Sequence, residues 1–475
     1  MTRLAEALGV ITLVGGALAL YLGWMQWTGC FDGPSLLMQL RHGVWDRVTA
    51  NFLYLPLAGT WSELLAGLDV PQYEATAAFS AVATCGGLVL LHLAGRRFGL
   101  PWRSALGATV LTALCPAIVF FGTVVEIHGP FTLFAGLSLW ATARLCARVT
   151  PARAALAGAS SGLAYLMHAS GIALPVLMVG LLWAVPRSAS RAQRLRAASA
   201  LSAMHLVWVA LGPTAIGSLL GCRWSTAGAF AVFGEYAAEA LEHPEWLLGS
   251  VWREWLWPFA PLSVAWLTAF AAPGLRPLAG AFAVALVLYG AMAFLALRRI
   301  DGHGAYLLPL AWPAAWLAVL TVPRGVLWGL ALLSVALAAS GIALHDRPER
   351  SQSYAAGVRQ LAAGRPVTLL MADYFDREAC AIALPEVEPV SVPSFVGFGA
   401  GPLLAGLPRL TETFRARLGR GERILLSAAA EATLQEYRDA ATLPAAGVFL
   451  DYLHREFEVS AVRAVGFRGF ILREP

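Results

Sequence analysis

The sequence is poor in charge and contains no lysine. Only 13% of its 475 residues are charged, and all 34 basic residues are arginine. Soluble domains carry roughly 25% charged residues, whereas 58% of this chain is hydrophobic. The composition therefore excludes an ordinary soluble protein and predicts an integral membrane protein. The net charge of +5 does not indicate nucleic acid as a partner, because arginines in such a chain mainly set membrane orientation.

The six cysteines show no spacing typical of a metal site or a redox pair. If the outer compartment is oxidising, Cys30 and Cys222 are candidates for a disulfide between two outer loops, with unpaired cysteines as the alternative. We expect no cleavable signal sequence, because the apolar run after Arg3 is long enough to remain as a helix.

Long apolar segments dominate the first 344 residues. A spanning helix needs about 20 mostly apolar residues, so we predict a mainly α fold, a polytopic bundle of about eleven transmembrane helices. The fifth and sixth segments are separated only by the stretch around His168, either as two short helices at a break or as one kinked unit. The predicted spans are 7–24, 76–94, 105–122, 129–145, 154–168, 170–186, 198–219, 259–273, 280–297, 305–321 and 325–343.

The arginines predict the orientation. With the N-terminus in the cytoplasm of a multi-pass inner (plasma) membrane protein, thirteen arginines of the membrane part fall in cytoplasmic loops and six on the outer face. Nearly all carboxylates of this part fall outside, Glu6 being the exception. We therefore expect the functional site on the outer side of the membrane, where the loops 25–75 and 220–258 are long.

Residues 345–475 differ in composition, with 15 arginines and 16 acids. Short apolar runs at 367–371, 423–426 and 469–472 indicate strands, and the stretch 428–441 indicates a helix. We predict a membrane module over 1–344 and a small α/β domain over 345–475. Because eleven spans end outside, the domain is expected to be extracytoplasmic (periplasmic or extracellular).

Four features of the outer face carry candidate chemistry. Each has a structural alternative: a turn at Asp32, a helix cap at Glu126, a hydrogen-bonded break at His168, and lipid contacts at the arginines. Two adjacent outer arginines run against the positive-inside trend, and phosphate is a natural partner for arginine. The features are Asp32 with Arg41, His42 and Tyr54; Glu126 with His128; His168; and Arg298 and Arg299 with His303 and Tyr306.

These motifs resemble the GT-C superfamily of membrane glycosyltransferases, in particular its protein mannosyltransferase and aminoarabinose transferase branch. Asp32 after the first span and the run Tyr54-Leu55-Pro56-Leu57 match the family order. Glu126 matches the acid that opens the fourth span, although His128 stands where a tyrosine is common. A Gly-rich, His-containing span of the family is similar to Gly162-Leu163-Ala164 with His168 and Pro175. The family's basic-x-x-Tyr-x-Leu-Pro segment resembles the stretch from His303 to Pro309.

The resemblance implies transfer of a sugar from a polyprenyl-phosphate donor to an acceptor hydroxyl, with inversion. It assigns the general base to Asp32 and a second acid to Glu126. Arg298, Arg299 and His303 would hold the phosphate. Arg41, Tyr54 and Tyr306 are further candidates for substrate binding. His42, His128 and His168 are weaker candidates for contacts with the sugar or the acceptor.

The implied partners are the sugar lipid, an acceptor glycan, lipid or protein, and membrane lipids. No cofactor is certain; a divalent cation held by Asp32, Glu126 and His128 is left open. The alternatives are a lipid or lipid-linked sugar transporter (flippase), a polysaccharide polymerase or ligase, and a non-catalytic relative. A transporter would favour acids within spans and internal repeats, and the sequence shows neither.

Overall fold

The computed structural model describes most of the chain and divides it into two compact units. One unit comprises Met1–Gln26 and Gln39–His345, and the other comprises Trp27–Met38 and Asp346–Pro475. We describe each unit by itself. The described residues are 2–28, 32–42, 51–185, 189–222, 224, 234, 237–297, 302–371, 374–391, 400–439 and 444–475.

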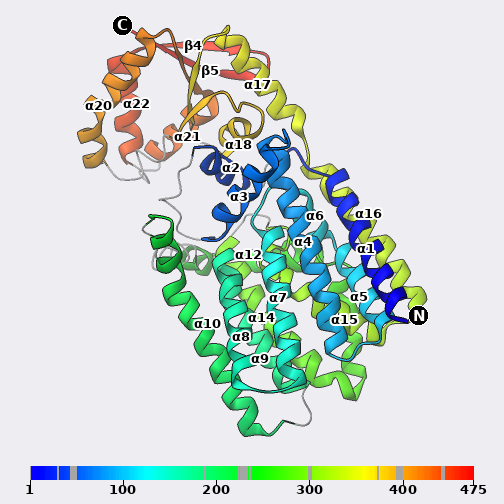
Figure 1. Ribbon diagram of the computed structural model, residues 1–475. Coiled ribbons are helices and arrows are strands. Elements are labelled where there is room, and N and C mark those ends of the chain that lie inside the picture. Colours follow the sequence, from blue (N-terminus) through cyan, green and yellow to red (C-terminus); the bar gives the residue numbers. More distant parts are fainter. Residues whose placement is uncertain are drawn as a thin grey trace. The chain divides into compact units, whose positions relative to one another are not determined.

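The first unit is a helical bundle, and each of the eleven predicted segments coincides with a helix or with two consecutive helical elements (Figure 1). The continuous ones are α1 (Thr2–Gly23), α4 (Gln72–Arg97), α7 (His128–Ala147), α8 (Pro151–Met167), α10 (Arg191–Leu219), α14 (Arg276–Leu297) and α16 (Arg324–His345). The divided ones are α5 (Trp102–Ala113) with α6 (Pro116–Thr123), η1 (Ala169–Ala173) with α9 (Leu174–Ala184), α13 (Leu262–Ala265) with η3 (Trp266–Ala271), and η5 (Ala305–Leu310) with α15 (Ala311–Thr321).

Proline accounts for one of these divisions. Pro116 occupies the first position of α6, where its missing N–H costs no helical hydrogen bond. The residue before it, Cys115, has an extended conformation, as expected before proline, and α5 and α6 are bent by 62°.

Within the described residues, five helices are long and apolar enough to cross a membrane, or six if the bent pair α5–α6 is one span. These helices make the chain a membrane protein. The count of eleven spans stays a prediction, since several segments are shorter than a full span.

Short helices lie between these segments. Helix α2 covers Gly33–His42 and α3 covers Tyr54–Ala66. The segment 220–258 contains α12 (Trp246–Val251) and a π-helical turn, η2 (Trp252–Leu256), and η4 (Pro273–Leu275) precedes α14. Of the two cysteines proposed to pair, Cys222 is a free thiol, so it does not form the predicted disulfide in this structure. Cys30 lies outside the described residues.

The second unit contains a five-stranded sheet in the order β2-β1-β3-β5-β4. Strand β1 pairs parallel with β2 and β3, and β5 pairs antiparallel with β3 and β4. The strands are β1 (Val367–Met371), β2 (Glu388–Ser391), β3 (Arg423–Ser427), β4 (Glu458–Ala464) and β5 (Phe467–Arg473); the helices are α17 (Pro348–Ala362), α18 (Tyr374–Ile382), α20 (Ala400–Gly419), α21 (Ala428–Asp439) and α22 (Pro444–Glu456).

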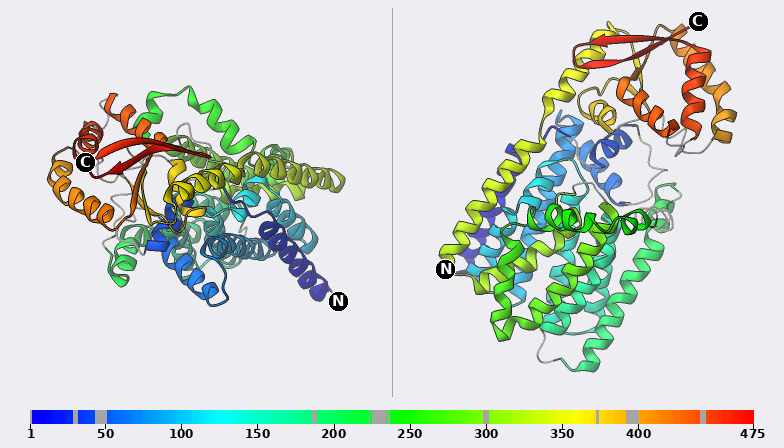
Figure 2. Two further views of the ribbon diagram at one scale, coloured as in Figure 1. Left: turned by 90° about the horizontal axis from the view of Figure 1, so that it is seen from above. Right: turned by 180° about the vertical axis from the view of Figure 1, so that it is seen from behind.

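Helices cover both faces of this sheet (Figure 2). One core joins Leu426 of β3 to α20, α21 and α22, and the other joins Leu425 of the same strand to α17 and α18. The alternation of neighbouring residues between two faces is the period of a strand. An α/β architecture with the three predicted strands is therefore confirmed in this unit.

The segment 27–38 is packed with the second unit, a placement that the sequence analysis did not make. The backbone N–H of Trp27 donates to Asp346 Oδ1 at 2.8 Å, and that of Arg347 donates to Thr28 Oγ1 at 2.7 Å. Met38 packs against the α17–α18 core. The connection between α1 and α4 is thus divided between the two units.

Candidate active site

A buried carboxylate lies in the connection between α6 and α7. Glu126 has no exposed surface, and its Oε1 accepts the backbone N–H of Ile127 at 2.9 Å. The same oxygen lies 3.3 Å from His128 Nδ1, and Ser80 of α4 donates its hydroxyl to the Glu126 carbonyl oxygen at 3.3 Å. Since burying a carboxylate without polar partners is costly, these contacts fix the carboxylate at the start of α7.

His168 lies at the break between α8 and η1. Its backbone is extended, and its Nδ1 accepts the backbone N–H of Ser170 at 3.3 Å and lies 2.7 Å from the Ser170 hydroxyl. An Nδ1 that accepts a hydrogen bond places the proton of the neutral imidazole on Nε2. Gly171 permits the break, because a Cβ there would stand 2.4 Å from the Tyr165 backbone nitrogen. The prediction of two helices meeting at a break is confirmed.

Three predicted site residues meet beside this break. The His128 and His168 rings have centroids 4.3 Å apart, and the His168 and Tyr306 rings 5.2 Å apart. Both histidines are buried. Residues from the start of α7, the break after α8 and η5 thus form one polar and aromatic group next to Glu126.

The loop before η5 is held by a second buried carboxylate. Glu254 of η2 is 2% exposed, and its two oxygens accept the backbone N–H groups of Gly302 at 2.6 Å and Gly304 at 3.1 Å. A Cβ at Gly302 would lie 2.6 Å from Glu254 Oε2, so only glycine fits against the carboxylate. His303 between them has a φ of 47°, a left-handed conformation that is uncommon outside glycine.

This loop places His303 against a second aromatic group. Its ring stacks on Phe120 with centroids 4.1 Å apart, and His345 lies 4.9 Å from the same phenyl ring. His345 Nδ1 is 2.7 Å from Gln26 Oε1, while Gln26 Nε2 donates to Thr123 Oγ1 at 2.7 Å. Four histidines, which we call the histidine cluster, therefore lie along the end of α6: His128, His168, His303 and His345.

Tyr54, at the start of α3, is also fully buried. Burial, and after it the nearby charge of Glu126, holds the pKa of Tyr54 well above its usual value. Its hydroxyl makes no hydrogen bond to any residue in the described part of the chain. A buried hydroxyl near Glu126 is suited to a hydrogen bond with a bound substrate.

The remaining predicted residues are Arg298, Arg299, His42, Arg41 and Asp32. Arg298 and Arg299 lie outside the described residues, as does the side chain of His42. Arg41 is half-buried in α2. Asp32 is exposed and belongs to the second unit, where its carbonyl oxygen accepts the Leu36 N–H at 2.8 Å at the start of α2.

Glu254, Gln26 and His345 were not predicted as site residues from the sequence. Glu254 stands among tryptophans, and Gln26 and His345 meet across 319 residues of sequence. The one local signal was a glutamate inside an aromatic run, Trp252-Arg-Glu-Trp.

Within the described ranges, no group of three or more His, Cys, Asp or Glu side chains is arranged to hold a metal ion. The acids and imidazoles of the first unit can instead accept and donate hydrogen bonds to hydroxyl and phosphate groups.

The chain shares its fold with two solved structures of low sequence identity, so the predicted resemblance is confirmed at the level of the fold. The chain is similar to ArnT from Cupriavidus metallidurans, whose crystal structure contains undecaprenyl phosphate. The TM-score is 0.54 and the sequence identity 15%, over 98% of this chain and 97% of that one.

A second similar structure is the archaeal oligosaccharyltransferase AglB from Archaeoglobus fulgidus, in complex with an inhibitory peptide and a dolichol-phosphate. Here the TM-score is 0.52 and the identity 13%, over 97% of this chain and 74% of that one. No family model and no curated protein matches the sequence.

Proposed function

We propose that this protein is a membrane glycosyltransferase that moves a sugar from a polyprenyl-phosphate donor to an acceptor hydroxyl on the outer face of the membrane. The observation that supports this most is the end-to-end likeness to a structure holding undecaprenyl phosphate. The arrangement of Glu126, His128, His168 and Tyr306 adds the polar groups that such a reaction needs.

In the proposed reaction, a base removes the proton of the acceptor hydroxyl as its oxygen attacks the anomeric carbon. The bond between this carbon and the phosphate oxygen breaks, and the polyprenyl phosphate leaves with the electron pair. Direct displacement of this kind inverts the anomeric centre. Asp32 is the proposed base, on the sequence resemblance alone, and positive groups stabilise the departing phosphate.

Glu126 and Tyr54 are proposed to orient the substrates. A carboxylate fixed by Ile127 and a neighbouring imidazole can accept a hydrogen bond from a sugar hydroxyl, and the Tyr54 hydroxyl can donate one. His303 and Tyr306 are proposed to contact the donor, with Arg298 and Arg299 holding its phosphate. Glu254 would then position that loop without touching substrate.

The proposal is tested with purified protein, a polyprenyl-phosphate sugar and mixed acceptors, with released lipid phosphate and glycosylated product both measured. We expect product from the wild type and a loss of about 100-fold or more with Asp32→Asn, the size typical of a lost general base. Glu63→Gln, an exposed acid on α3, is the matched control and should keep full activity.

Full activity of the Asp32→Asn variant would remove Asp32 from the mechanism. If instead the wild type moves labelled lipid across a vesicle membrane and transfers no sugar, the protein is a transporter and the glycosyltransferase hypothesis is wrong.

A further inference from the structure

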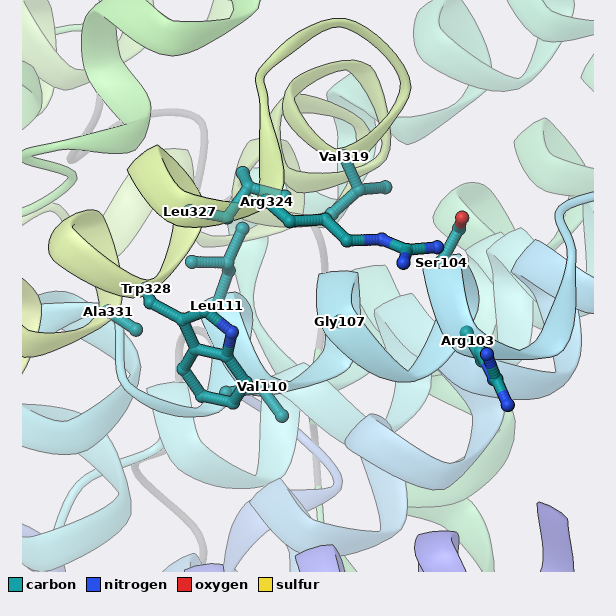
Figure 3. Close-up of a pocket in the computed structure, with 10 residues that line it drawn as sticks. All are labelled: Arg103, Ser104, Gly107, Val110, Leu111, Val319, Arg324, Leu327, Trp328 and Ala331. Carbon is teal, nitrogen blue, oxygen red and sulfur yellow. The ribbon is translucent and has the colours of Figure 1, made fainter. Parts of the chain in front are cut away.

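A groove of about 290 Å³ opens along α5, the end of α15 and the start of α16 (Figure 3). Its lining residues recur at helical spacing on both long walls. On α5, Arg103 is followed by Gly107 and Leu111, and on α16, Arg324 is followed by Trp328. Residues three, four or seven apart share one face of a helix, so the groove runs along both helices from their first turns. None of its lining residues belongs to the histidine cluster.

The end of the groove formed by these first turns is positively charged. Arg103 and Arg324 are both exposed, and Figure 3 shows the Arg324 side chain reaching across toward Ser104. No acid lines the groove. Within the described residues, neither arginine forms an ion pair or donates a hydrogen bond to the protein.

The helix ends add to this charge. α5 has no side-chain cap at its N-terminus, and the first turns of both helices direct backbone N–H groups toward the same end of the groove. A cation in a first turn lies at the unfavourable end of the helix dipole, whereas an anion there is stabilised. The two arginines and the two helix N-termini at this end of the groove therefore favour the binding of a negatively charged group.

The rest of the groove is apolar. Val110, Leu111, Val319 and Leu327 form its wall, and Trp328, which is 68% exposed, stands beside it. A free anion would leave this wall in contact with lipid tails, and a ligand without negative charge would leave the arginines unneutralised. A molecule with one anionic head and a long apolar body satisfies both parts.

We propose that this groove binds an anionic glycerophospholipid, with its phosphate at Arg103 and Arg324 and an acyl chain along Leu111 and Trp328. The positive-inside pattern predicts this end of α5 and α16 on the cytoplasmic side, where anionic lipids collect and basic pockets between helices hold their headgroups. The sugar donor of the proposed reaction is used on the outer face, so it is not the occupant. The proposal does not depend on sugar transfer.

The test is native mass spectrometry of the purified full chain with phosphatidylglycerol and with phosphatidylcholine of the same acyl chains. We expect phosphatidylglycerol to remain bound and phosphatidylcholine to be lost. The double variant Arg103→Ala/Arg324→Ala should weaken phosphatidylglycerol binding about thirtyfold, given the usual contribution of two arginines near a lipid headgroup.

A matched control removes two exposed arginines from the first turns of α10, Arg191→Ala/Arg196→Ala. These lie on the same predicted face but outside the groove, and the bound lipid should persist. Equal loss in both double variants would reveal general attraction to a basic surface and overturn the site.

A second variant keeps both charges and fills the groove. At Gly107 a Cβ would meet only Val319 Cγ1, at 3.7 Å, and leucine is a better helix former than glycine, so Gly107→Leu should fold and exclude the acyl chain. Retained phosphatidylglycerol in this variant, or its displacement by millimolar inorganic phosphate, would overturn the proposal in favour of a simple anion site.

Discussion

The negative charge of Glu126 can be removed without a large change in the packing around the side chain. Glutamine at this position keeps the shape and can still accept the Ile127 N–H that the carboxylate accepts at 2.9 Å, but it carries no charge. We expect Glu126→Gln to fold normally and to lower the kcat/KM of sugar transfer by about 100-fold. Steady-state transfer assays check this, with size-exclusion profiles as the measure of folding.

The control for this variant is again Glu63→Gln, because it makes the same chemical change at an exposed position. Wild-type kcat/KM in Glu126→Gln would return Glu126 to a structural role as the residue that shapes the start of α7.

Individual site residues were predictable from sequence where a local pattern marked them. Glu126 and His128 stood out as polar residues between two apolar runs, and His168 stood at a visible break. No local sequence pattern singles out Gln26 and His345, because they pair only once the first and last parts of the bundle are packed. Likewise, the two hydrogen bonds of Glu254 join it to residues that are 48 and 50 positions away in the sequence.

At the scale of elements, the loop that precedes η5 depends on Glu254. In Glu254→Gln, one oxygen is replaced by an NH2 group that cannot accept from a backbone N–H, so one buried donor loses its partner. Such a loss costs about 1–3 kcal/mol. We expect faster hydrogen exchange at the Gly302 and Gly304 amides and a fall in kcat/KM of roughly tenfold.

Amide exchange read by mass spectrometry separates this positioning role from a global effect. Glu242→Gln changes an exposed acid in the same segment between α10 and α13, and it should leave both the exchange rates and the activity unchanged. Unaltered exchange at 302–304 in Glu254→Gln would contradict the role assigned to the carboxylate.

The strands that the sequence predicts well are those with a neighbouring strand at each edge. Strands β1, β3 and β5 form the centre of the sheet, and their apolar runs were visible in sequence. Strands β2 and β4 are the edges, and edge strands carry charged residues that hide their pattern. In β4, Glu458-Val-Ser-Ala-Val-Arg-Ala alternates weakly and has no buried residue.

For the whole molecule, the division into units predicts the result of removing the C-terminal domain. A chain ending at His345 lacks Asp346, the acceptor of the Trp27 N–H, and the core that receives Met38. We expect residues 27–38 to be cleaved by chymotrypsin roughly tenfold faster than in the full chain, because local opening rises when packing is lost. Mass spectrometry of the fragments measures this.

Supplying residues 346–475 as a separate chain is the control, and it should restore protection of the segment. Equal cleavage rates in the full and shortened chains would mean that residues 27–38 hold their conformation without the second unit.

The pairing of Trp27 with Asp346 also sets an order of assembly during synthesis. The two residues are 319 positions apart, so at about 5–20 residues per second the early segment waits roughly 15–60 s for its partner. The helices of the first unit can insert during this interval, but the segment containing Asp32 reaches its native packing only when the last domain has left the ribosome. A segment that is synthesised early is therefore among the last parts to be completed.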